Sequence, residues 1–276
     1  MSTTRRLDPV LLLALPATLY IAIVYGLPLL FLLGRSLFGT GGLESFVGFF
    51  ADPFSWTVLA NTLRSAALVT LVCLVIGYPT ALVLARAGGF AQATILVAII
   101  LPLSVGVVVK AFAWQIVLRR DGIVSQAMTG LGLWSEPQRL LFTEAGLVIG
   151  AANIFVPFMI LPIYAVLKLV DPRLGEAAAT LGASPVYRFL KVALPLSLPG
   201  IVTGVAFVFS MAASMYVIPS LVIGDRFQTL ATLTGRSFLF MRNEQLGSTT
   251  AVVLLALTVA VVIASASLSR RLGGAQ

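Results

Sequence analysis

The stretch of this chain with the clearest potential for chemistry is a polar island, Glu-Ala-Ala-Ala-Thr-Leu-Gly, at residues 176–182. After nine intervening residues the chain reads Val192-Ala193-Leu194-Pro195. The Glu176 carboxylate can accept charge-assisted hydrogen bonds, and the small side chains of Ala177 and Ala178 let another surface approach closely. These residues therefore indicate recognition of a partner protein, and Arg173 on the same segment adds a second charge to the docking surface.

Local signals predict how this island folds. Asp171 is a good N-cap, Pro172 suits the first helical position, and Gly182 suits a left-handed position that ends a helix. Ser184 and Pro185 repeat the cap-and-proline signal and start a second short helix. We therefore predict a helix–turn–helix elbow over residues 169–195, from which Leu194 and Pro195 lead into an apolar segment.

The sequence lacks the residues for histidine-based catalysis and for ATP binding. The chain has no histidine, and its single cysteine, Cys73, lies in an apolar run without a thiol partner. Phosphate-binding loops need Gly-Lys-Ser/Thr, but Lys110, Lys168 and Lys191 are followed by Ala, Leu and Val. We expect no catalytic residue, no metal site and no cofactor bound by this chain.

The composition places the chain in a membrane, because 59% of its residues are apolar, 10% are charged and the mean hydropathy is +1.05. A bilayer core about 30 Å thick needs about 20 apolar residues per helix. Continuous apolar runs of this kind predict an all-α fold of six spans rather than a barrel. The predicted spans are Val10–Leu33, Ser65–Ala85, Ala93–Leu118, Ala145–Leu167, Pro199–Ile223 and Thr249–Leu268.

One membrane domain covering residues 1–276 is expected, because no long polar linker divides the chain. The first run follows Arg5 and Arg6 but lacks a small-residue cleavage site, so we interpret it as a retained helix. Six spans put both termini on one side. The basic residues of the loops are divided nine to eight between the two sides, so the positive-inside preference does not set the orientation. Their scatter also speaks against a nucleic-acid-binding face.

The motif from Glu176 to Pro195 resembles the signature of a known protein family. Glu-Ala-Ala, three residues, Gly182, nine residues, then a hydrophobic residue, any residue and Leu-Pro resembles the signature of permease subunits of bacterial ATP-binding-cassette importers; Val192 replaces the usual isoleucine. The resemblance implies a type I importer fold and an elbow in the cytoplasm, seated in a groove of the ATPase with Glu176 meeting a basic residue. It also implies cytoplasmic termini, and ATP and Mg used by partner subunits.

Further segments resemble the spermidine/putrescine permease branch: Leu74–Pro79, Lys110–Trp114, Asp121-Gly122 and Pro157–Pro162. This implies an inner-membrane importer of polyamines, with opines, phosphonates or other anionic or zwitterionic solutes as the alternative. The resemblance also implies a heterodimer with a second, similar permease, two cytoplasmic ATP-binding subunits, an extracytoplasmic binding protein and surrounding lipid.

Lys110 is the one basic residue well inside a predicted span. A charge at mid-membrane costs about 2.5–3.5 kcal/mol on insertion scales, so Lys110 is expected to face protein or water. It is either a residue of the solute pathway or an anchor that pairs with carbonyls or an outer carboxylate. Trp114, one turn further on the same face, suits a cation–π contact or an interfacial anchor.

Other polar residues inside the spans are candidates for the solute pathway, and they serve equally well as contacts between helices. They are Asn153, Ser210, Ser214 and Tyr216. The pairs Gly146/Gly150 and Gly200/Gly204 have the small-xxx-small spacing of close helix packing. No acid lies within the six spans; Glu144 and Asp225 lie at their outer ends, so a polycation would need charge from the partner permease.

Two rival functions come from other classes. An ATP-independent carrier would need an ion-binding carboxylate within its spans, which this chain lacks. A membrane scaffold whose elbow recruits a soluble protein is distinguished by its failure to support solute flux when all partners are present.

Overall fold

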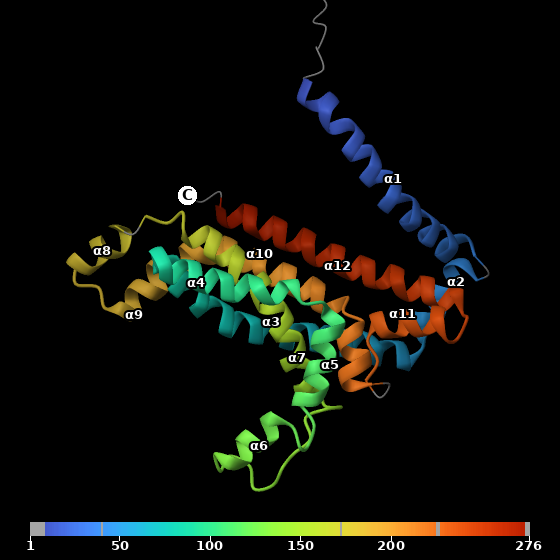
Figure 1. Cartoon of the computed structure of the whole chain (residues 1–276). Helices are drawn as coiled ribbons and strands as arrows, with labels where there is room; N and C mark the ends of the chain where they lie inside the picture. Colours follow the sequence, from blue (N-terminus) through green and yellow to red (C-terminus); the bar gives the residue numbers. More distant parts are fainter. Residues whose placement is uncertain (1–8, 40, 172, 225–226, 274–276) are drawn as a thin grey trace, which may run out of the picture.

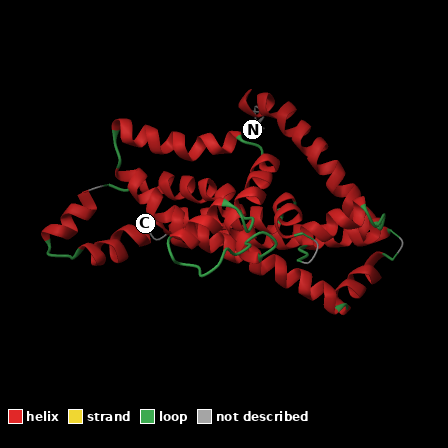
Figure 2. Cartoon of the chain, turned by 60° about the horizontal axis from the view of Figure 1, so that its bottom comes forward, coloured by secondary structure: helices red, strands yellow, loops and turns green. Residues whose placement is uncertain are grey.

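The computed structural model describes residues 9–39, 41–171, 173–224 and 227–273, and within these residues the chain is helical, with no strand. Figure 2 shows the described residues as helices joined by loops. Five helices are long and apolar enough to cross a membrane, and a bent pair makes a sixth candidate. The all-helical membrane fold expected from composition is confirmed.

The centre of the molecule is built by three long helices. They are α3 (Pro53–Arg86), α7 (Glu144–Leu167) and α10 (Leu194–Ala213). Their shared core holds fully buried side chains such as Val69, Met159 and Val208. Glycines permit the close approach, because a Cβ at Gly200 would lie 2.9 Å from the Ile163 Cα, and one at Gly204 would lie 2.8 Å from the Met159 sulfur. The packing role expected for this glycine pair is confirmed.

The second expected glycine pair behaves differently. A Cβ at Gly150 would meet Trp114 at 3.7 Å, so this glycine does seat a neighbouring helix. At Gly146 the Cβ would lie 2.3 Å from the carbonyl oxygen of Leu140, in the loop just before the helix. Gly146 therefore makes room both for its own preceding loop and for the Leu118 side chain, whose Cδ1 would lie 3.3 Å from the Cβ, so this pair also serves close packing.

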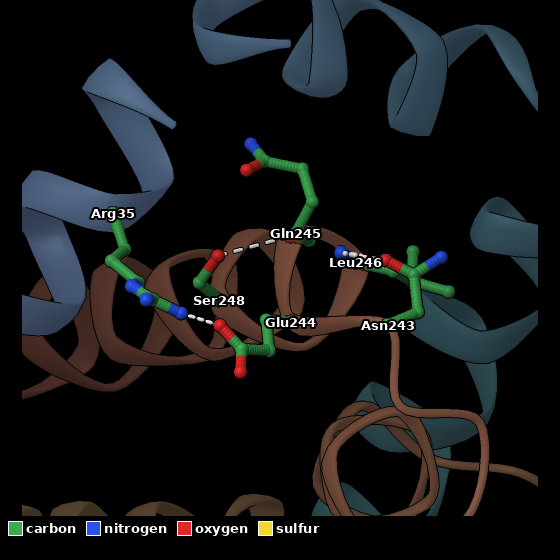
Figure 3. A network of polar contacts seen from close by, with 6 residues as sticks. All are labelled: Arg35, Asn243, Glu244, Gln245, Leu246 and Ser248. Atoms are coloured by element: carbon green, nitrogen blue, oxygen red, sulfur yellow. Dashed lines mark hydrogen bonds and ion pairs between the residues drawn. The ribbon is translucent and has the colours of Figure 1, made fainter. Parts of the chain in front are cut away.

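The last span lies beside this core, and the first span contacts the last. Helix α1 (Pro9–Phe38) joins α12 (Glu244–Gly273) at one end and diverges from it along its length (Figure 1). At the joined end Arg35 forms an ion pair with Glu244, and the Gln245 amide donates to the Ser36 carbonyl at 3.3 Å. Figure 3 shows Arg35 reaching across to Glu244. Apolar side chains such as Tyr20, Leu30 and Phe31 are exposed along α1, as a lipid-facing helix requires.

Two predicted spans do not form a single helix each. The segment Ala93–Leu118 is not one straight helix: α4 (Gly89–Ile100), the 3₁₀ turn Leu101–Ser104 and α5 (Val107–Val117) are bent by 98°. Pro102 within the 3₁₀ turn has no N–H to donate to the carbonyl of the preceding helical turn. The whole segment is apolar, so its average hydropathy does not reveal the bend.

The predicted span Pro199–Ile223 also differs, because α10 starts at Leu194 and ends at Ala213. A separate π turn follows at Pro219–Ile223. Pro219 occupies the first position of this π turn, six residues beyond the end of α10, so it does not itself end that helix. The second and sixth spans begin earlier than predicted, at Pro53 and Glu244.

The connecting segments carry short helices. These are α2 (Gly42–Ala51), α6 (Ile123–Gly130) and α11 (Leu230–Leu239). Helix α11 lies against α12, whereas α6 stands away from the bundle (Figure 1). Helices α8 (Arg173–Thr180) and α9 (Pro185–Arg188) form the elbow, which projects beyond the ends of α4 and α10 (Figure 1).

Candidate functional site

The first helix of the elbow is fixed at both ends by local hydrogen bonds. The Asp171 carboxylate accepts from the Arg173 backbone N–H at 2.9 Å; Pro172, predicted at the first helical position, lies outside the described residues. At the other end Gly182 has a φ of +81°, and the N–H of Ala183 donates to the carbonyl of Ala178 at 3.0 Å. This arrangement is a Schellman motif, which any residue but glycine would strain.

The second helix begins where Ser184 and Pro185 predict. The Ser184 hydroxyl accepts from the Tyr187 N–H at 3.2 Å. Together these caps satisfy the exposed ends of two very short helices, which in isolation would not be stable. The elbow is therefore a preformed unit, as the sequence predicts.

A π turn at Phe189–Ala193 joins the elbow to the span α10. Leu194 donates its N–H to the carbonyl of Phe189, five residues back. The cause lies in Pro195, which has no N–H and whose ring would crowd the carbonyl of Lys191 in a regular α-helix. Leu194 and Pro195 thus build the joint between elbow and membrane.

The elbow presents its polar residues to solvent. Arg173, Glu176 and Ala177 are exposed, and Ala178 is half-buried. Behind them lies a cavity of about 450 Å³ whose wall includes Glu176, Arg86 and Arg188. A carboxylate held on a capped helix beside an open cavity can receive a basic side chain from outside.

Tyr78, within a segment noted only for resemblance, links the elbow to the core. Its ring packs edge-on against Phe189 in the π turn, with centroids 5.8 Å apart, and its hydroxyl lies 3.0 Å from the Ser197 hydroxyl. Tyr78 belongs to α3, so any movement of the π turn acts on the core directly. No local sequence signal identifies this contact, because Tyr78 and Ser197 are 119 positions apart.

The structure brings together two of the six residues predicted to line the solute pathway. The Trp114 indole N–H donates to the Asn153 side-chain oxygen at 3.4 Å, joining α5 to α7. Lys110 lies in the first turn of α5, half-buried and directly after the 98° bend. It is therefore not in the middle of a continuous span, which corrects the position assumed from hydropathy.

The other three residues lie around the end of α10. The Ser214 hydroxyl donates to the Ser210 carbonyl at 2.7 Å, whereas the Ser210 hydroxyl is buried without a hydrogen-bond partner. Tyr216 borders a cavity of about 380 Å³ that Gln228, Arg236 and other residues also line. Lys110, Trp114 and Asn153 are not among the residues that line this cavity.

Sequence reasoning missed Gln228 as part of this cavity. Its side-chain oxygen is buried and has no hydrogen-bond partner among the described residues, and it lies in the loop before α11. A buried acceptor without a partner is costly and is a place where a bound donor would be stabilised. Asp225, noted for its carboxylate in the same loop, lies outside the described residues.

Comparison with known proteins decides the family. Residues 77–274 match the model of the binding-protein-dependent transport system inner membrane component. This chain belongs to that family. The match contains the elbow, the π turn and every residue predicted for the solute pathway, so the permease family accounts for the segment in which the site lies.

Individual relatives agree with this assignment. The chain is 32% identical over 220 residues to the spermidine/putrescine transport system permease protein PotB of Haemophilus influenzae, covering 79% of this chain and 77% of that protein. It is 31% identical over 203 residues to PotB of Escherichia coli, covering 74% of each.

A solved structure shows the same fold. It is a bacterial alginate ABC transporter in complex with an alginate pentasaccharide-bound periplasmic protein, with a TM-score of 0.74 and 16% identity. The match covers 94% of this chain and 93% of that one. The chain is therefore a transporter component with the fold of an importer permease.

Proposed function

We propose that this chain forms half of the translocation pathway of an ATP-driven importer for a small organic solute, with polyamines as the first solute class. The observation that carries this proposal is the capped elbow, Asp171 to Arg188, joined to the core by a π turn. Such a unit is suited to transmit force, because its caps keep it folded while its exposed residues contact a partner.

Energy would come from separate cytoplasmic subunits that bind and hydrolyse ATP with Mg, since this sequence has no phosphate-binding loop. When those subunits close, they would push α8 with Glu176 in their groove. The push would pass through the π turn and Tyr78 into α3 and α10 and switch the pathway between outward and inward access. The elbow and both termini are then cytoplasmic.

The further partners follow from the family and its relatives. A second, similar permease would complete the pathway, most simply as a heterodimer, and an extracytoplasmic binding protein would deliver the solute. The family description, which names binding-protein dependence, supports this arrangement. The alginate transporter crystallised with a periplasmic protein supports it as well.

The assignment to polyamines is supported by the likeness to PotB over three quarters of the chain. The cavity beside Tyr216 offers what an ammonium group needs: the unpaired oxygen of Gln228 and the rings of Tyr216 and Phe240. Arg236 lies in the same wall, so this chain alone does not neutralise a polycation.

An anionic or zwitterionic solute is the second candidate, and Lys110 favours it. A lysine in the first turn of α5 adds its charge to the positive end of the helix dipole, which favours an anion. Replacing Lys110 by Gln separates the two solutes. Uptake of a polyamine would persist or rise in K110Q, whereas uptake of an anion would fall.

The first test is ATP hydrolysis by the complex purified through this subunit, reconstituted in lipid and supplied with binding protein loaded with polyamines, opines or phosphonates. Stimulation by polyamines supports the proposal, and stimulation by another class corrects the solute alone. Absence of any ATPase from the purified complex would refute the interpretation of the elbow.

A further inference from the structure

A cavity of about 900 Å³ lies between the end of α5 and the loop that leads into α7. Its wall contains three arginines, Arg119, Arg120 and Arg139, and one acid, Asp121. The ion pairs among the described residues join Arg35 to Glu244 and Arg64 to Glu144, so within this part of the chain no carboxylate pairs with any of the three guanidinium groups. We call this site the arginine cavity.

Two of the three guanidinium groups are held in place. The Arg120 Nε donates to the Pro137 carbonyl at 3.1 Å, and the Arg139 guanidinium lies 4.3 Å from the centroid of the Phe142 ring. Phe142 itself adopts φ +69°, a conformation that costs about 1–3 kcal/mol and that often marks functional sites. Strained backbone thus supports the ring on which Arg139 stacks.

The surroundings of the arginine cavity are those of a membrane surface. The cavity is next to the exposed Ile116 at the end of α5, and the helix α6 that follows exposes Ile123. Leu131 and Leu133, directly after α6, are 72% and 66% exposed, and the half-buried Trp134 comes next. Exposed apolar side chains and a tryptophan beside arginines are typical of segments that lie in the lipid headgroup region.

We propose that the arginine cavity binds the phosphate of an anionic phospholipid headgroup, with α6 and Leu131–Trp134 lying in the membrane interface. Guanidinium groups match phosphate oxygens in pairs, so three of them around one cavity provide both charge and geometry. The segment directly precedes α7 and therefore lies at the opposite end of that helix from the elbow. The proposal explains why this end keeps so many arginines despite the positive-inside preference.

The test uses the intact chain in a neutral detergent, without transport partners, so its result is independent of the proposed transport function. Native mass spectrometry would measure the retention of phosphatidylglycerol and, separately, of phosphatidylcholine. Arg139→Gln should weaken the phosphatidylglycerol affinity about fivefold, and the combined change of Arg119, Arg120 and Arg139 to Gln about a hundredfold, because each basic residue near an anionic membrane contributes about a fivefold gain. Phosphatidylcholine should be retained equally by all variants.

Arg242→Gln is the matched control, because Arg242 is exposed in the loop that leads into α12 and is not part of the cavity wall. It removes one charge and should leave phosphatidylglycerol binding unchanged. Equal phosphatidylglycerol affinity of the wild-type chain and the triple variant would overturn the proposal. An acidic protein surface would then be the expected partner of the cavity. Displacement of the lipid by inorganic phosphate at equal concentration would also overturn it, because the ligand would then be a soluble anion.

Discussion

The buried pair Tyr78 and Ser197 gives a quantitative test of how the elbow is joined to the core. Ser197 is fully buried, and its single hydroxyl proton is donated to the Leu194 carbonyl at 2.9 Å. The bond between the two hydroxyls, 3.0 Å long, must therefore be donated by Tyr78. Because Tyr78 is the donor and Ser197 the acceptor, removing either hydroxyl should change the free energy of unfolding by a different amount.

Ser197→Ala leaves the Tyr78 hydroxyl, on a residue 8% exposed, without its acceptor and should cost about 1–3 kcal/mol. Tyr78→Phe removes the donor but leaves Ser197 bonded to Leu194, so its cost should be about 1 kcal/mol or less. In the double variant the orphaned hydroxyl is gone. A coupling energy of about 0.6 kcal/mol, the average for hydrogen bonds between membrane helices, and no more than about 1.7 kcal/mol is expected.

The assay is reversible unfolding in mixed micelles with increasing dodecyl sulfate, followed by circular dichroism for the wild-type chain, the two single variants and the double variant. Strictly additive free energies would refute the interaction between Tyr78 and Ser197. A Tyr78→Phe cost larger than that of Ser197→Ala would refute the assigned direction of donation.

Three further substitutions test the elbow and the core. Glu176→Lys should abolish co-purification of the ATPase while the chain still inserts, whereas Glu44→Lys, on the exposed face of α2, should not. Gly182→Ala should lower transport per ATP hydrolysed, because alanine at φ +81° costs about 1–2 kcal/mol; Gly175→Ala in the same helix meets no atom within 4 Å and should be neutral. Gly200→Leu should lower the free energy of unfolding in the micelle assay by at least about 3 kcal/mol. The Cβ alone would collide with α7, and the rest of the leucine side chain would add to the overpacking.

The elbow could be predicted from sequence almost to the residue. Its boundaries depend on Asp171, Gly182 and Ser184, each of which acts on backbone groups two to five positions away. Such short-range chemistry is visible in sequence because it needs no knowledge of the rest of the fold. Element type and membrane class were equally accessible, since both follow from composition and apolar run length.

The sequence did not predict the breaks within two spans, or the contacts between residues that are far apart in the chain. Pro102 lies in the 3₁₀ turn after α4, and residues 214–216 interrupt the helix after Ala213, although the apolar character of both predicted spans is continuous. The contact between Trp114 and Asn153 joins two spans 39 positions apart, and only the packing of α5 on α7 reveals it. The roles of both residues in solute passage remain predictions.

The π turn before Pro195 has a consequence for the orientation of the elbow. A π turn contains one residue more than an α turn, so the helical phase on its two sides differs by about 100°, the rotation per residue. This rotation decides which face of α9 points outward for a given face of α10 packed against α7. Deleting one residue within Phe189–Ala193 would rotate the elbow by roughly a quarter turn about the helix axis while the span kept its packing.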